Sequence, residues 1–79
     1  MKKYKNLSGK SGVAYYEIGD DFIRIYFQDG SWYLYTYKSA GSHAIENLKR
    51  LAIAGKGLGG EVAKKDHPNY ESKVLVKKK

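Results

Sequence analysis

The chain has 79 residues, with 15 Lys and Arg against 8 Asp and Glu and a formal net charge of +7. Since separate cores rarely form below roughly 50 residues each, the length excludes a two-domain enzyme and predicts one domain. Cysteine is absent, which excludes disulfides, thiolate zinc sites and thiol nucleophiles and favours a reducing, cytoplasmic location.

Much of the positive charge lies at the two ends of the chain. Six of the fifteen basic residues are Lys2, Lys3, Lys5, Lys77, Lys78 and Lys79. Residues 6–76 keep nine basic and eight acidic residues, so their net charge is +1. We therefore expect basic tails at 1–10 and 77–79 around a single domain at 11–76. Such tails either attract polyanions in a salt-dependent way or act only as disordered, solubilising ends.

Nothing in the sequence predicts export or membrane insertion. The first residues carry no apolar run, so we expect no signal peptide. No stretch approaches the about 18 consecutive apolar residues that a membrane span needs. We expect a soluble protein without a membrane partner.

Three strands are predicted in the first half of the chain. Residues 13–18 are rich in β-branched and aromatic side chains and end at Gly19-Asp20-Asp21, which is typical of a strand and a turn. Residues 22–27 form the second strand, Asp29-Gly30 supplies a hairpin turn, and residues 32–37 return as the third strand. These strands predict an antiparallel meander.

The spacing of apolar residues then changes to three and four, which predicts an amphipathic helix of about three turns. Ser39 and Ser42 can cap its start, and Gly55 lies just past its end. Residues 61–65 have weak helical character, and residues 73–76 have strand propensity and either pair with a sheet edge or fray. The fold class is α+β, a three-stranded antiparallel meander with one helix on one face and either a short C-terminal helix or strand. The apolar residues of the main helix are Ala44, Ile45, Leu48, Leu51 and Ala52.

The length of the hairpin loop decides which face of the sheet each residue of the third strand occupies. A two-residue loop, Asp29-Gly30, places Tyr33, Tyr35 and Tyr37 on the face away from the helix, beside Arg24 and Tyr26. A three-residue loop, Gln28-Asp29-Gly30 with Gly30 left-handed, shifts the register by one. The tyrosines then enter the core, and Trp32 and Leu34 lie outside. The sequence leaves both registers open.

Both faces of the hairpin carry large apolar groups, and one short helix covers only one of them. The second face therefore needs a partner: another part of the chain, a second copy, or a ligand. Tyrosine rings stack on unpaired bases, although cross-strand tyrosines are also ordinary sheet formers. The residues expected to bind nucleic acid are Arg24, Tyr26, Tyr33, Tyr35, Tyr37, Lys38 and Lys56.

The stretch Phe-Gln-Asp-Gly-Ser-Trp-Tyr-Leu-Tyr at residues 27–35 resembles the KTSC domain, which occurs at the C-terminus of some lysyl-tRNA synthetases and as small bacterial proteins. The similarity covers most of residues 11–60. The resemblance implies no established activity, but the family's company with a tRNA synthetase suggests RNA binding. The matching residues are Ile23, Ile25, Phe27, Gly30, Tyr33 and Tyr35, with Ser11-Gly12-Val13, Tyr16, Gly19, Leu51-Ala52 and Gly55 in the flanking elements.

No pattern in the sequence predicts catalysis. Gly55, Gly57 and Gly60 spell G-x-G-x-x-G, but they follow a helix rather than a strand, so a dinucleotide site is not expected. Residues 57–60 fit the GXXG loop of KH domains, but three strands before the helix do not match that topology. His43 and His67 are too few for a metal site. We expect neither an enzyme nor a metal or cofactor.

Two functions remain as hypotheses. The first is a module that binds RNA or another single-stranded nucleic acid through the aromatic face and the lysine tails. The second is a protein-interaction or homodimerisation module that buries the same face against another chain. Salt separates them, because phosphate contacts weaken steeply with salt and apolar contacts do not.

Overall fold

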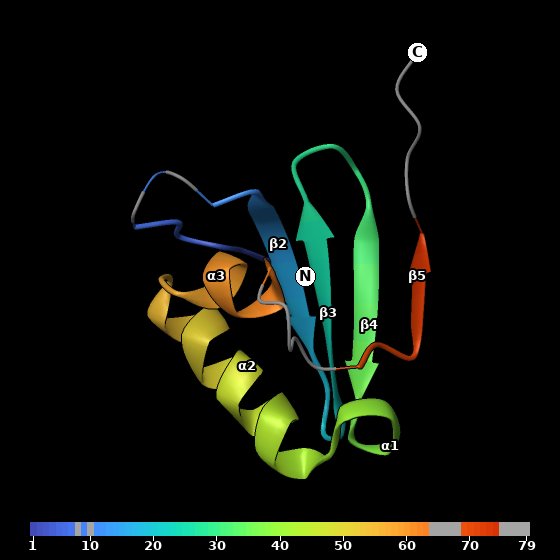
Figure 1. The fold of residues 1–79 in the computed structure, drawn as a ribbon. Coiled ribbons are helices and arrows are strands. Elements are labelled where there is room, and N and C mark those ends of the chain that lie inside the picture. The colour runs from blue at the N-terminus through green and yellow to red at the C-terminus, as the bar shows by residue number, and fades with distance from the viewer. Residues whose placement is uncertain (8, 10, 64–68, 75–79) are drawn as a thin grey trace.

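The computed structural model describes residues 1–7, 9, 11–63 and 69–74. Their five strands form one antiparallel sheet in the order β1-β2-β3-β4-β5, so each strand pairs with its neighbour in the chain (Figure 1). The elements are β1 (Lys2–Lys3), β2 (Val13–Ile18), β3 (Phe22–Phe27), β4 (Trp32–Thr36), α1 (Tyr37–Ala40), α2 (Ser42–Ala54), α3 (Leu58–Ala63) and β5 (Ser72–Val74). The predicted α+β class is confirmed. The predicted three-stranded meander is extended by a strand at each edge: β1 was not predicted, and β5 was one of the alternatives for the C-terminal segment.

The N-terminal edge strand changes the expected domain boundary. Lys2 and Lys3 pair with Tyr16 and Tyr15 of β2. The next residue, Tyr4, is only 3% exposed, and its Oη accepts a hydrogen bond of 3.2 Å from the backbone N–H of Leu58. The expected tail at residues 1–10 is therefore, in its first part, an integral strand and core residue of the fold.

The C-terminal segment pairs with a sheet edge, which is one of the two alternatives expected for residues 73–76. Residues 72–74 pair with β4, with Trp32 opposite Val74 and Leu34 opposite Ser72. The expected strand at 73–76 thus begins one residue earlier, and its last two residues, like the lysine tail at 77–79, lie outside the described residues.

The β3–β4 hairpin has the three-residue loop. The backbone N–H of Phe27 donates to the carbonyl of Ser31 at 2.8 Å, and Gly30 has φ 91°. This loop places Ile25 opposite Tyr33 and Ile23 opposite Tyr35. Because facing residues point to the same side of a sheet, these tyrosines share the face of the buried isoleucines, and the two-residue loop does not occur.

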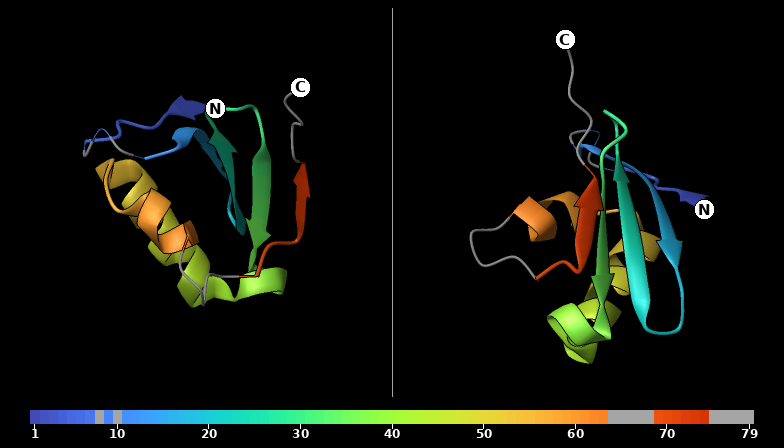
Figure 2. Two further views of the ribbon diagram at one scale, coloured as in Figure 1. Left: turned by 45° about the horizontal axis from the view of Figure 1, so that its top comes forward. Right: turned by 90° about the vertical axis from the view of Figure 1, so that its right-hand side faces the viewer.

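All described helices lie on one side of the sheet (Figure 2, right). The third strand ends at Thr36, one residue earlier than predicted, because Thr36 and Ser39 form a capping box that starts α1. Gly41 precedes α2 without a side-chain cap, so Ser42 is the first helical residue rather than the cap. The predicted stop at Gly55 is confirmed by its left-handed φ of 79°. The core is Tyr4, Val13, Tyr16, Ile23, Ile25, Tyr35, Ile45, Leu48, Ala52 and Leu58.

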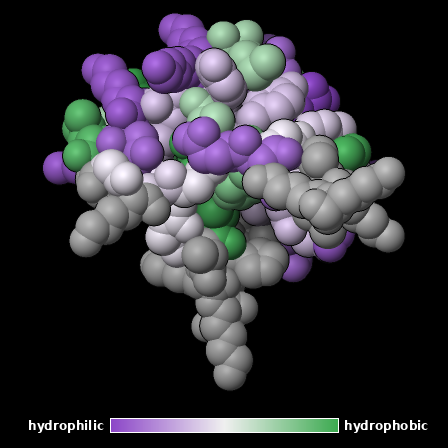
Figure 3. Space-filling model, turned by 90° about the horizontal axis from the view of Figure 1, so that it is seen from above, coloured by the Kyte–Doolittle hydropathy of each residue, from purple (hydrophilic) through white to green (hydrophobic). Residues whose placement is uncertain are grey.

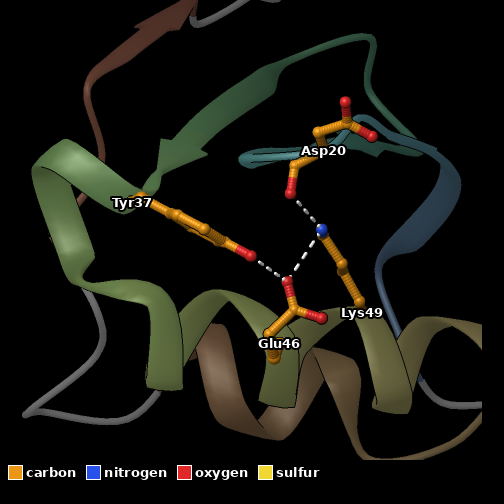
Figure 4. A network of polar contacts seen from close by, with 4 residues as sticks. All are labelled: Asp20, Tyr37, Glu46 and Lys49. Atoms are coloured by element: carbon orange, nitrogen blue, oxygen red, sulfur yellow. Dashed lines mark hydrogen bonds and ion pairs between the residues drawn. The ribbon is translucent and has the colours of Figure 1, made fainter.

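A polar network fixes α1 and α2 to the turn between β2 and β3 (Figure 4). Glu46 Oε2 accepts hydrogen bonds from Tyr37 Oη at 2.6 Å and from Lys49 Nζ at 2.9 Å. Lys49 Nζ also donates to the backbone carbonyl of Asp20 at 2.9 Å. The hydrogen bond from Tyr37, and after it that from Lys49, lowers the pKa of Glu46, and the same bond raises the pKa of Tyr37. Tyr37 therefore has a structural partner for its hydroxyl.

Candidate nucleic-acid interface

One face of the sheet is not covered by any described helix, and we call it the outer face (Figure 2, right). Because side chains alternate along a strand, it receives every second residue of β3 and β4, together with their partners on β2. Its aromatic and charged side chains come from three adjacent strands in the middle of the sheet. The residues are Tyr15, Glu17, Phe22, Arg24, Tyr26, Trp32, Leu34 and Thr36.

Three aromatic residues cross the outer face in a single line, which we call the aromatic row: Tyr15, Tyr26 and Trp32. Tyr15 is the register partner of Tyr26, and Tyr26 is the partner of Trp32. The line continues at both ends, with Lys3 opposite Tyr15 and Val74 opposite Trp32. Neighbouring strands lie about 4.8 Å apart, so the row runs perpendicular to the strands for roughly 10 Å.

The rings of the aromatic row are accessible rather than packed into a closed cluster. Tyr15 is 43% exposed, and Tyr26 and Trp32 are half-buried. The centroids of Tyr26 and Trp32 are 6.5 Å apart, and the two ring planes are tilted by 51°. Both rings keep part of their surface exposed, although the Arg24 guanidinium lies over the Trp32 ring.

Arg24 lies beside the aromatic row and is held in place by three neighbours. Its Cζ lies 4.8 Å from the centroid of the Trp32 ring. Its Nη1 is 3.1 Å from Glu17 Oε1 and 3.4 Å from Tyr26 Oη. The pairing with Glu17 offsets its charge, so Arg24 contributes a fixed planar guanidinium for stacking more than long-range attraction.

Two of the expected binding residues lie on the opposite face. Tyr35 is 1% exposed, and Tyr33 packs on it with ring centroids 6.2 Å apart. Burial, and after it the neighbouring Tyr33, raises the pKa of Tyr35 to about 12. A base cannot reach Tyr35 while the helices cover it. Tyr33 is half-buried and lies on the same face as Tyr35, so neither tyrosine lies on the outer face. Arg24 and Tyr26 lie on the outer face, as expected in either register.

The remaining three expected residues are spread over the helical layer. Tyr37 and Lys38 belong to α1, which follows the end of β4, and Lys56 follows the far end of α2. The 13 residues of α2 separate the two lysines by roughly 20 Å at 1.5 Å per residue. The structure therefore does not bring the two lysines together, and the helices that carry or precede these residues lie on the side of the sheet opposite the outer face.

Two residues of the aromatic row were absent from the expected set. Trp32 was expected outside the core only with the three-residue loop, which was one of the two alternatives for the hairpin. Tyr15 is turned outward by a shift in register between Val13 and Tyr15, which is a β-bulge that the strand pattern does not signal. The three-residue loop therefore predicted an outward Trp32, whereas no feature of the sequence predicted the outward position of Tyr15.

Other kinds of site find little support in the described parts of the chain. These residues contain no group of three or more His, Asp or Glu that could hold a metal ion. Within the same ranges, no helix has the length and apolar character to cross a membrane. No family model, curated protein or solved structure matches the chain.

Proposed function

We propose that this chain is a small non-enzymatic module that binds single-stranded RNA through its outer face. The observation that carries the proposal is the aromatic row, in which three rings on adjacent strands stay accessible on a face that no described helix covers. Base stacking on an aromatic side chain contributes about 1–3 kcal/mol per base. Sheet surfaces with such rings are a common way of reading unpaired RNA.

Two further features support this proposal. The net charge of +7 attracts a polyanion from a distance and raises the rate of encounter. The resemblance of residues 11–60 to the KTSC domain, which accompanies a tRNA synthetase, agrees with an RNA partner. We retain membership of that family as part of the proposal.

Trp32 makes the proposal directly testable because it is the only tryptophan in the chain. We would titrate the protein with a single-stranded RNA of about 8 nucleotides, a length that one small domain covers, and follow Trp32 fluorescence. Stacking of a base should quench it, and the quenching should persist at physiological salt.

The matched variants are Tyr26→Ala on the outer face and Tyr37→Ala on α1. Tyr26→Ala should weaken RNA binding by roughly 5- to 150-fold, the equivalent of one lost stacking contact. Tyr37→Ala should leave the affinity unchanged, since Tyr37 lies outside the outer face. Absence of quenching at physiological salt, or equal affinities of the two variants, would contradict RNA binding at this face.

A second candidate, homodimerisation or binding of a protein partner, is favoured by the apolar residues beside the aromatic row. Leu34 lies on the outer face, and Val74 at its edge is 45% exposed. Exposed apolar side chains that lie together on one face are typical of protein interfaces. Sedimentation at several concentrations in about 1 M salt, where surface charges are screened, should show a dimer if this face self-associates and a monomer if it does not.

A further inference from the structure

A hollow of 410 Å³ opens at the end of the aromatic row that lies beside β1. It is lined by Tyr15 of the row and by polar residues of the N-terminal segment and the β3–β4 loop, Lys3, Lys5, Asn6 and Gln28 among them. This end of the molecule is mainly hydrophilic, and strongly hydrophobic residues form only small separate areas on it (Figure 3).

The path of the N-terminal segment explains why two lysines border the hollow. Tyr4 is buried, and both its backbone and its side chain are hydrogen-bonded. Its backbone N–H donates to the carbonyl of Ala14 at 2.9 Å, and its Oη accepts a hydrogen bond from the backbone N–H of Leu58. In an extended segment, the residues before and after an inward side chain point outward. Tyr4 thus directs Lys3 away from the core, whereas the side chain of Lys5 passes along Gly55 at the end of α2 and borders the hollow from that side. The bulge at Ala14 then displaces this part of β2 from regular pairing.

The charge at the hollow is not compensated within the described residues. No acidic residue lines it, and neither Lys3 nor Lys5 forms an ion pair with a described residue. Arg24, the other cation of this face, is paired with Glu17. The cation at the centre of the outer face is therefore neutralised, whereas the hollow at its β1 end is bordered by two lysines without an acidic partner among the described residues.

We propose that the hollow holds a backbone phosphate of the RNA whose neighbouring base stacks on Tyr15. This inference rests on the proposed function and adds the direction of binding: the RNA is anchored at β1 and crosses the sheet along the aromatic row toward Trp32. Lysine ammonium groups are compact charges suited to phosphate. The Gln28 amide donates one N–H to the carbonyl of Val13 at 3.4 Å, and its second N–H can donate to a phosphate oxygen.

The first test compares two double variants of equal net charge. One is Lys3→Gln with Lys5→Gln, and the control is Lys38→Gln with Arg50→Gln, at two exposed basic residues that do not line the hollow. The affinity of each for the short RNA is measured over a range of salt concentrations. Each lost phosphate contact lowers the slope of log affinity against log salt by about 0.7 for single strands. We expect a fall of about 0.7 for the first variant, because the hollow holds one phosphate, and almost none for the control.

The second test leaves the protein unchanged and neutralises single phosphates of the RNA as methylphosphonates, one position at a time. One position near one end of the RNA should weaken binding to the unmodified protein more than the others. The same replacement should not lower the affinity of the Lys3→Gln, Lys5→Gln variant any further, because this variant has already lost the contact between the lysines and the phosphate. Circular dichroism confirms that the variants are folded.

The outcomes separate this inference from the proposed function. Quenching of Trp32 with equal salt slopes for the two double variants overturns the phosphate site and leaves RNA binding at the outer face intact. Absence of quenching in the unmodified protein overturns both. The phosphate site is supported if the salt slope falls more for the Lys3→Gln, Lys5→Gln variant than for the control and if one phosphate of the RNA is sensitive to neutralisation.

Discussion

The two faces of the sheet use the same residue types for opposite purposes. Tyr33 and Tyr35 of β4 lie beneath the helices, whereas Tyr15 and Tyr26 lie on the outer face beside Trp32. The residues of β4 alternate between these environments, so a shift of one position in the hairpin would exchange them. The comparison teaches that residue type alone does not identify a binding surface in a Tyr-rich strand, because the backbone register decides which rings are available.

The sharpest way to break this comparison is to truncate one aliphatic side chain on each face. Ile25 is fully buried, so Ile25→Ala should lower the free energy of unfolding by about 2–5 kcal/mol. Leu34→Ala, on the outer face, should cost roughly 1 kcal/mol. Urea denaturation of both variants measures the difference. Equal costs would mean that the outer face is covered in solution, as by a second copy of the chain.

A second prediction concerns the ionisation of the covered tyrosine. Burial raises the pKa of Tyr35 from 10.0 to about 12, so the folded state holds this proton more tightly than the unfolded chain. The protonated Tyr35 phenol therefore contributes to the free energy of unfolding. This contribution is fully present below pH 10 and is lost as the pH rises toward 12, by an amount on the order of 2 kcal/mol. Urea denaturation below pH 10 and at about pH 11 should show a smaller decline for Tyr35→Phe than for the unmodified protein. An identical decline would contradict the burial of this phenol.

The third prediction tests the loop that sets the register. Gly30 has φ 91°, a conformation that costs an L-residue roughly 1–2 kcal/mol, so Gly30→Ala should destabilise the fold by that amount. The control is Gly60→Ala in α3, where an added Cβ meets no atom within 4 Å. That substitution should be neutral or stabilise by roughly 0.5–1 kcal/mol. If Gly30→Ala were also neutral, the loop would have a different conformation in solution.

The central elements were predictable because their signals are local. The strand at 22–27, the helix over 42–54 and its stop at Gly55 follow from alternation, from three- and four-residue spacing and from glycine geometry. The α+β class could therefore be predicted. The third strand was set one residue too long, because the role of Thr36 as a helix cap competes with its preference for strands.

The edges and the candidate site depended on contacts between distant residues. Nothing near Tyr4 in the sequence shows that its hydroxyl meets Leu58, so the lysines around it suggested a tail. Lys38 and Lys56 were among the residues expected to bind nucleic acid, although the fold places Lys38 on α1 and Lys56 after α2, in the helical layer. Arg24 and Tyr26 were placed on the outer face because their position does not depend on the loop length.

The order of the strands also bears on how the chain folds. Every strand pairs with its neighbour in sequence, so most of the sheet assembles through short loop closures, which favour rapid folding. The contact of Tyr4 with Leu58 instead joins residues 54 positions apart, and we expect it to form after the rate-limiting step. Tyr4→Phe, which removes only the accepting oxygen, should then speed unfolding and leave the folding rate nearly unchanged in stopped-flow measurements. The N-terminal lysines would accordingly reach their final position last, once the rest of the sheet has formed.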